Sequence, residues 1–402
     1  MRDPDQQVSD TNDRTEDRWA RDLAHHISHG ADLPVLLMTT AHSTGNLSVL
    51  RKEWRPVDVL GVAKCDVSED EQDRIKEECA WLLADHRRSG GSPPGRPTYD
   101  FLRAVGDWFL GSGIEPYIPL LAEELVFDRN DLRRPLWSKD RIAPGRSLHV
   151  AIVGAGESGI ILGVRLKQAG VPFTIYEKNT DVGGTWLENG YPGCRVDINS
   201  FVYSYASVPH IWPDYFGMRG DVLSYLQRVA KENGLYEHIR FGTEIEDAAW
   251  NEGTKSWTLT MRSRGQIETV SRDAVIFAVG QLNRPKLPDI PGVDIFGGAS
   301  LVVHGGSIVM FSELTAKYIL DALRLLLEKD ERTMDVRPDV FEDYNQRIDD
   351  ANRARAWGFS KVNSWYKDAR GRVGQNYPFT AAEYYQRTDS VVKADFNFGT
   401  GR

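Results

Sequence analysis

A glycine-rich turn between two apolar runs constrains the fold of this chain more than any other feature. Residues 154–159 read GAGESG, a complete G-x-G-x-x-G pattern, and they directly follow the apolar run 148–153. An amphipathic segment comes next, and then a second apolar run, 173–176, which leads into Glu177. This order of strand, glycine turn, helix, strand and acid is typical of a βαβ unit that binds a dinucleotide. The sequence therefore predicts an α/β fold with a parallel sheet.

The residues of this turn have distinct expected tasks. Gly154 permits the tight turn, and Gly156 lets the backbone approach a pyrophosphate. Gly159 lets the helix pack closely on the strand, while the helix N-terminus around Ser158 offers N–H groups to phosphates. The Glu177 carboxylate would bind both ribose hydroxyls and repel a 2′-phosphate, which favours FAD or NAD over NADP. A glycine-rich turn packed for structural reasons alone is the alternative interpretation.

Composition argues against several classes of protein. The 402 residues are 41% hydrophobic and 27% charged, with a formal net charge of -9. An acidic chain of this kind is not expected to bind nucleic acid or an anionic membrane. No apolar run approaches the ~18 residues of a membrane span, and the N-terminus has no apolar signal-peptide region. The three cysteines form no C-x-x-C pair and no disulfide framework, so we expect a reduced, cytoplasmic protein with no metal site.

The pattern of residues changes along the chain, which indicates several segments. Helical patterns dominate the N-terminal third, and a segment rich in Pro, Gly and charge precedes the glycine turn. A short Gly/Ser joint, Gly298 to Ser300, lies between two later stretches. We therefore expect a disordered tail at 1–14, a helical accessory domain at 15–132, a linker at 133–147, and one Rossmann-type domain in two parts, 148–298 and 299–402.

The C-terminal part contains a strongly amphipathic helix. Ser312 is expected to cap this helix, with Glu313 in its first turn. Its apolar stripe comprises Ile319, Leu320, Leu323 and Leu327.

The segment after the acid separates FAD from NAD. Residues 177–207 read EKNTDVGGTWLENGYPGCRVDINSFVYSYAS, a long stretch rich in glycine and aromatic residues. A simple NAD domain would continue to another helix and strand, and this stretch is too aromatic for disorder. It therefore indicates a functional segment beside the cofactor.

This segment resembles the flavin-contacting segment of the class B flavoprotein monooxygenases, specifically of the Baeyer–Villiger type. The resemblance continues through DAVIFAVGQLNRPKLPDIPG and WGFSKVNSWYKDARGRVGQNYPF, and the region around ADLPVLLM is similar to 4-hydroxyacetophenone monooxygenases. The strand that ends in Ala278, Val279 and Gly280 is similar to the family's A-T-G turn, with Val in place of Thr. The resemblance implies a glutathione-reductase-like, FAD-binding Rossmann-type domain, preceded by a helical N-terminal extension.

In that family NADPH reduces FAD, and oxygen is then inserted next to a ketone, for example from an aryl ketone to an ester. By matching positions, the resemblance assigns the ADP half of FAD to Gly154, Gly156, Ser158, Gly159 and Glu177. It assigns the flavin half to Gly184, Thr185, Trp186, Asp197 and Tyr203, and Lys178 and Gly280 complete the expected cofactor set. Asp197 is also the expected catalytic residue, because the family's acid at this position steers a catalytic arginine. The structural alternatives are a cap or salt bridge for Asp197 and a place in the core for Trp186.

One departure from the family pattern is large. Members carry a second G-x-G-x-x-G in an NADPH domain inserted between the halves of the FAD domain, and this sequence has only the first copy. The family fingerprint F-x-G-x-x-x-H is incomplete as well. Counted from Phe296 and Gly298, its histidine position holds Val302, and His304 comes two places late. We therefore expect that the second Rossmann domain, its NADPH site and the catalytic arginine are absent, and that the Gly/Ser joint is the seam between the two halves.

These observations predict an FAD-binding flavoprotein of the Baeyer–Villiger family that is truncated and does not use NADPH efficiently. A flavoenzyme, natural or engineered, that is driven by another reductant or by peroxide is one alternative. A non-catalytic flavin-binding or dimerisation protein is another, and a plain NAD dehydrogenase is the weakest because it leaves the GGTW motif unexplained. A ketone substrate and a homodimer formed through the N-terminal helical region are the expected partners.

Overall fold

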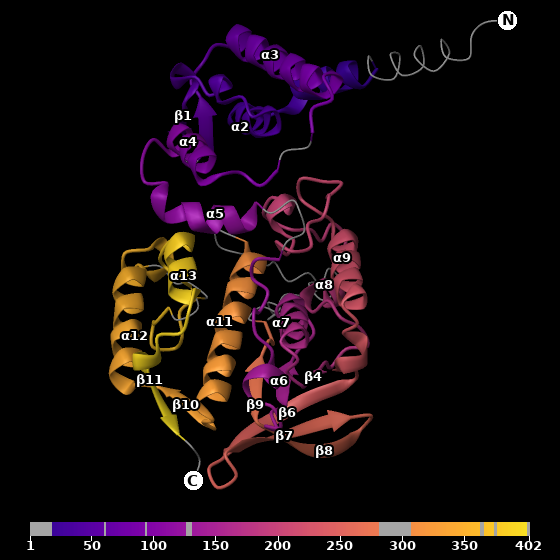
Figure 1. Ribbon diagram of the computed structural model, residues 1–402, viewed down its shortest axis with the longest axis vertical. Helices are drawn as coiled ribbons and strands as arrows, with labels where there is room; N and C mark the ends of the chain where they lie inside the picture. Colours follow the sequence, from indigo (N-terminus) through magenta and orange to yellow (C-terminus); the bar gives the residue numbers. More distant parts are fainter. Residues whose placement is uncertain are drawn as a thin grey trace, which may run out of the picture. The chain divides into compact units, whose positions relative to one another are not determined.

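The computed structural model of the protein describes residues 18–59, 62–92, 95–125, 131–280, 307–361, 366–373 and 376–399. The chain divides into two compact units, Met1–Asn130 and Asp131–Arg402 (Figure 1). The expected tail, the Gly/Ser joint and the fingerprint positions Val302 and His304 lie outside the described residues.

The N-terminal unit is built mainly from helices around a small apolar core, which includes Leu37, Trp54 and Ile75. Its longest described helix begins after Ser68, whose hydroxyl accepts a hydrogen bond from the backbone N–H of Glu71 at 3.3 Å. An antiparallel hairpin was not expected, because its two strands are short and each carries a charged residue. The elements of this unit are a helix over 18–30, α2 (Leu33–Thr44), α3 (Glu69–Arg88), α4 (Tyr99–Leu110), α5 (Ile118–Glu124), the 3-10 helices Leu47–Val49, Lys52–Trp54 and Glu115–Tyr117, β1 (Pro56–Val59) and β2 (Val62–Cys65).

The second unit is organised by a parallel sheet with strand order β5-β4-β3-β9. The central strand pairs with β4 on one side and with β9 on the other, and α7 (Glu157–Gln168) provides the crossover to β4. This is the βαβ unit that the glycine turn predicts, and the α/β fold class is confirmed. The strands are β3 (Val150–Val153), β4 (Phe173–Tyr176), β5 (Ile239–Arg240) and β9 (Ala274–Phe277).

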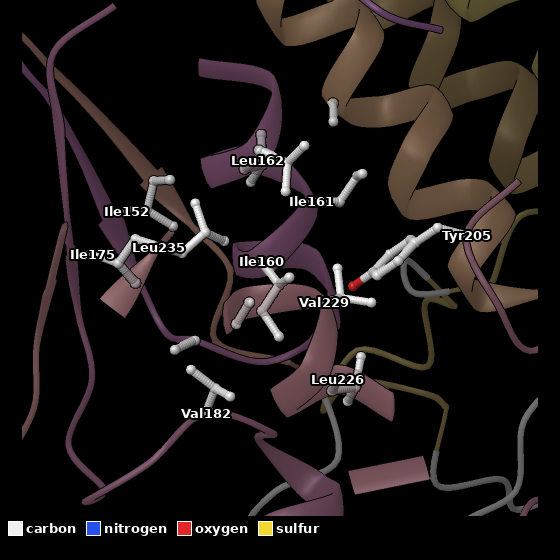
Figure 2. Packing of buried hydrophobic residues seen from close by; sticks show 14 of the residues in the cluster. Ile152, Ile160, Ile161, Leu162, Ile175, Val182, Tyr205, Leu226, Val229 and Leu235 are labelled. Atoms are coloured by element: carbon white, nitrogen blue, oxygen red, sulfur yellow. The ribbon is translucent and has the colours of Figure 1, made fainter. Parts of the chain in front are cut away.

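The two faces of this sheet are covered differently. Because side chains alternate along a strand, Val150 and Ile152 join the core shared with the helices, whereas Ala151 packs with Leu259 and Met261 of an antiparallel meander. Figure 2 shows the helical side of this core, where Ile160 and Ile161 of α7 lie among side chains of the strands and of α9 (Arg219–Glu232). The meander consists of β6 (Thr243–Asn251), β7 (Ser256–Ser263) and β8 (Gln266–Arg272).

The segment interpreted as a linker, 133–147, is packed into the second unit. It contains the short helix α6 (Lys139–Ile142), and Arg133 is only 4% exposed. The other elements of the unit are α8 (Thr185–Glu188), α11 (Ile308–Lys329), α12 (Pro338–Arg353), α13 (Ala381–Thr388), the 3-10 helices Ser200–Val202, Tyr236–His238, Ala356–Gly358 and Lys393–Asp395, and an antiparallel pair of β10 (Thr333–Val336) and β11 (Phe396–Gly399).

Helix α11 begins earlier than the sequence indicates. Its N-cap is Ser307, whose hydroxyl accepts from the backbone N–H of Met310 at 3.2 Å, so the expected cap at Ser312 and first-turn position of Glu313 are wrong. The apolar residues after Ser307 join the helix because Val309 and Met310 are buried. The expected stripe is largely confirmed, since Leu320, Leu323 and Leu327 lie in the main core and Ile319 packs against it.

No helix among the described residues is long and apolar enough to cross a membrane.

Candidate dinucleotide site

The register of the sheet brings the predicted site residues to one edge. Val153 pairs with Tyr176 of β4 and with Phe277 of β9, so these three parallel strands end at the same level. The residue that follows each strand therefore lies at this edge. These residues are Gly154 after β3, Glu177 after β4 and Ala278 after β9. In open parallel sheets, ligands bind outside the carboxyl ends of the strands, at the topological switch point where successive connections leave to opposite sides of the sheet.

The glycine turn shows why each glycine is there. Gly154 has φ of +103°, and a Cβ atom there would lie 2.6 Å from the carbonyl oxygen of Ala278. A Cβ atom on Gly159 would lie 2.0 Å from the carbonyl oxygen of Gly154. Gly156 differs, because a Cβ atom there would meet nothing nearer than the Cα of Gly184 at 3.7 Å. The first and third glycines are thus required by packing, whereas a Cβ atom on Gly156, the N-cap of α7, would make only an ordinary van der Waals contact.

Glu177 is held firmly at the end of β4. The residue is 4% exposed, its Oε2 accepts from the N–H of Ala155 at 2.7 Å, and its Oε1 accepts from the N–H of Asn179 at 2.8 Å. Each carboxylate oxygen has a second lone pair, so both can still accept a hydroxyl group. This arrangement suits an acid that binds the two hydroxyls of a ribose. The neighbouring Lys178 forms an ion pair with Glu188 at 2.9 Å.

The segment after Glu177 returns to the glycine turn. A Cβ atom on Gly184, the N-cap of α8, would lie 3.0 Å from the Cα of Gly156. Trp186 is 8% exposed and belongs to the core, and its Nε1 donates to the hydroxyl of Tyr203 at 3.1 Å. Both oxygens of Thr185 accept from the side chain of Asn189 at 2.9 Å. The loop is therefore ordered by its own hydrogen bonds, and its backbone at Gly184 lies close to Gly156.

Glu157, at the variable position of the motif, was not predicted as a site residue. The Tyr203 hydroxyl donates to its carboxylate at 3.3 Å, and the Tyr205 hydroxyl donates to its backbone carbonyl at 2.6 Å. Burial raises the pKa of Glu157 to about 7, although hydrogen bonds from Tyr203 and Ser312 oppose the rise. One feature of the sequence could have pointed to Glu157: it is an acidic residue inside a phosphate-binding turn, where a negative charge is unexpected.

Three further predicted residues are Ser158, Asp197 and Gly280. The Ser158 hydroxyl is 2.9 Å from the hydroxyl of Ser312 on α11. Asp197 is exposed, next to the isolated bridge between Arg195 and Met218. Gly280, with φ of +67°, is exposed at the end of a described range. The cofactor roles of these residues and the catalytic role of Asp197 stay predictions. No three His, Cys, Asp or Glu side chains in the described ranges could hold a metal ion.

The βαβ unit, the glycine turn and the acid after β4 define a Rossmann-type dinucleotide-binding domain. The family of NAD(P)-binding Rossmann-like domains matches residues 152–216. A Baeyer-Villiger monooxygenase of Streptomyces coelicolor is 39% identical over 154 residues, which are 38% of this chain and 29% of that protein. The FAD-binding monooxygenase tazF of Aspergillus terreus is 36% identical over 182 residues, 43% of this chain and 32% of that protein. The chain is thus related to the Baeyer–Villiger flavoprotein monooxygenases.

The similarity is partial. The chain spans about a third or less of the length of these curated relatives. Among solved structures, the OTEMO complex with FAD and NADP is 34% identical, with 37% of this chain and 28% of that chain covered and a TM-score of 0.34. The similarity of the N-terminal unit to 4-hydroxyacetophenone monooxygenases stays a prediction.

The raised pKa of Glu157 leads to a prediction on stability. An unfolded glutamate has a pKa of about 4.3, and that of Glu157 is about 7 in the folded chain. Its contribution to the free energy of unfolding is therefore fully present below about pH 4 and is lost as the pH rises to about 7. At about pH 8 the free energy of unfolding of Glu157→Gln should exceed that of the parent protein by about 3–4 kcal/mol, whereas near pH 4 the two proteins should have nearly equal stability.

Urea unfolding of both proteins across this pH range provides the measurement. Glu232→Gln is a suitable control, because Glu232 is in an exposed pair with Arg228 on α9, and its effect should stay within about 0.5 kcal/mol throughout. An equal effect of Glu157→Gln at both ends of the range would contradict the prediction.

Proposed function

We propose that the unit Asp131–Arg402 binds FAD as the flavin domain of a Baeyer–Villiger-type monooxygenase relative. The observation that carries the proposal is the shared sheet edge at which Gly154 and Glu177 follow aligned parallel strands. Identities of 36% to 39% to proteins named FAD-binding or Baeyer-Villiger monooxygenases favour FAD over NAD.

The residues at this edge fit the two ends of the ADP half of FAD. The N-terminus of α7 has no side-chain cap hydrogen bond and no side chain at its N-cap Gly156, so its N–H groups would bind the pyrophosphate. Glu177 would accept the ribose hydroxyls. When bound, FAD supplies the redox chemistry, and the segment from Gly184 to Tyr203 would hold the flavin half and exclude water from it.

We further propose that this chain does not accept electrons efficiently from NADPH. The support is the sequence, which contains a single G-x-G-x-x-G and has Val302 at the position where the family fingerprint has histidine. A hydride donor needs a site that positions it against the flavin. Insertion of oxygen next to a ketone, driven by NADPH, would then be very slow. A cytoplasmic location and pairing through the N-terminal unit also stay predictions.

One absorption experiment tests both proposals. We expect the full chain to bind about one FAD molecule per protein molecule and to show a flavin absorption spectrum after free FAD is removed. Without oxygen, NADPH should leave this spectrum unchanged within minutes, whereas dithionite should bleach it and so provide the positive control. Failure to retain FAD would contradict the binding proposal, and rapid bleaching by NADPH would contradict the second proposal alone.

A further inference from the structure

The strongest unused feature of the site is the carboxyl group of Glu157. We propose that Glu157 is a proton-linked positioning residue of the dinucleotide site: FAD binds best when this carboxyl group carries a proton, and binding takes that proton from solvent. The inference rests on the proposed FAD site and concerns how that site is regulated.

The hydrogen-bonding neighbours of the Glu157 side chain are neutral groups. Tyr203 donates to its carboxylate at 3.3 Å and is itself fixed by the indole N–H of Trp186 at 3.1 Å. Ser312 of α11 supplies a second hydroxyl partner, and its oxygen also lies 2.9 Å from that of Ser158. Within the described ranges, no lysine or arginine forms an ion pair with Glu157. Among the described side chains, the printed partners of the Glu157 carboxyl group are therefore hydroxyl groups and not cations.

The charged and titratable groups on the surrounding elements do not neutralise it. On α11, the carboxylate of Glu313 follows Ser312, and its charge is offset by Arg133 and Arg165. Tyr203 and Tyr205, which donate hydrogen bonds to Glu157, have pKa values raised by burial, so they stay neutral in the physiological range. Burial also raises the pKa of Tyr225, whose hydroxyl group accepts from the N–H of Tyr205. Glu157 is thus the group of this cluster that changes charge near neutral pH, consistent with its pKa of about 7.

The position of Glu157 on α7 makes its charge matter for binding. Glu157 is the first residue of the helix, directly after the N-cap Gly156. An ionised carboxylate in the first turn interacts favourably with the helix dipole, which is the same interaction that a bound pyrophosphate would use. Two anionic groups at one helix N-terminus repel each other, so the bound pyrophosphate favours the neutral carboxyl group. One proton moves from solvent to a Glu157 oxygen, and no other bond changes.

The size of the effect follows from linkage. A like charge nearby raises the pKa of a carboxyl group by about one unit or more. From a starting pKa of about 7, a rise of about one unit means that about half a proton is taken up per FAD bound near pH 7.5. The affinity for FAD should then fall about five- to tenfold between about pH 6 and pH 8.5.

Calorimetric titration of the full chain with FAD measures this proton directly. Titrations near pH 7.5 in phosphate and in Tris differ in heat by the number of protons taken up multiplied by the difference in buffer ionisation enthalpy. For Glu157→Gln, the heat of FAD binding should be corrected by buffer ionisation for about half a proton less than in the parent protein. Its affinity for FAD should be nearly independent of pH. Asp181→Asn is the matched control, because Asp181 also accepts from a tyrosine, Tyr236, at 2.8 Å but lies outside the glycine turn; it should keep the proton uptake of the parent protein.

A second variant separates proton linkage from a merely structural role. Tyr203→Phe removes the hydroxyl group that stabilises the ionised form, so the window of proton uptake should move to higher pH. Binding of FAD by the parent protein without proton uptake would overturn the inference and leave the proposed function intact. Proton uptake that persists unchanged in Glu157→Gln would also overturn it. No FAD binding at all would overturn the proposed function and the inference with it.

Discussion

Replacement of Gly156 by alanine should greatly weaken FAD binding in a protein that still folds normally. Gly156 has φ of -75° and ψ of -169°, which alanine adopts readily, and the nearest atom to the new methyl group would be 3.7 Å away. The methyl group would instead occupy the space where the backbone has to approach a pyrophosphate. We expect the Kd for FAD to rise by about 100-fold or more, equivalent to about 2.7 kcal/mol, while the free energy of unfolding changes by less than about 1 kcal/mol.

Gly159→Ala makes the same chemical change one turn further along the helix and should have the opposite profile. Its methyl group would lie 2.0 Å from the carbonyl oxygen of Gly154, and neither backbone can move without separating α7 from β3. We expect a loss of about 3 kcal/mol or more in the free energy of unfolding. Fluorescence titration with FAD and urea unfolding of both variants provide the measurements. Tight FAD binding by Gly156→Ala would mean that the ligand does not approach this turn.

This pair of variants depends on a part of the fold that local patterns predict well. The glycines, the apolar runs and Glu177 lie within a single stretch, and each has a fixed task in a βαβ unit. Contacts within such a unit follow from the spacing of residues along the chain. The turn and the acid could therefore be predicted from the sequence. The structure adds that Gly154 and Gly159 are required by packing, whereas Gly156 is not.

The parts that could not be predicted depend on contacts between distant segments. Glu157 meets Tyr203 and Ser312 only because α7, the aromatic segment and α11 pack together. The start of α11 was misplaced because Ser307 and Ser312 are equally good caps by sequence, and burial of Val309 and Met310 decides between them. No periodic pattern carries this information, since it arises from which surfaces are buried.

Replacement of Glu313 by glutamine should destabilise the second unit strongly. Glu313 on α11 is 0% exposed, and its Oε2 lies 2.9 Å from an Arg133 nitrogen and accepts from the N–H of Ala206 at 3.0 Å. Its Oε1 lies 3.5 Å from a nitrogen of Arg165, which is also 0% exposed and pairs with Asp131. Loss of one charge from a buried cluster leaves the opposite charge poorly compensated and typically costs about 3–5 kcal/mol.

The choice of glutamine isolates the charge, because its amide oxygen can still accept from Ala206. Glu328→Gln is the matched control on the same helix: Glu328 pairs with Arg324 at 2.7 Å in a partly exposed i,i+4 arrangement, for which we expect a loss below about 0.5 kcal/mol. Urea unfolding of both variants is the measurement. A loss of about 3–5 kcal/mol for Glu313→Gln alone would establish that α11 is held to α7 and to the segment before β3 by buried charge as well as by apolar packing. Equal, small losses for both variants would mean that Leu320, Leu323 and Leu327 hold α11 in place without help from this cluster.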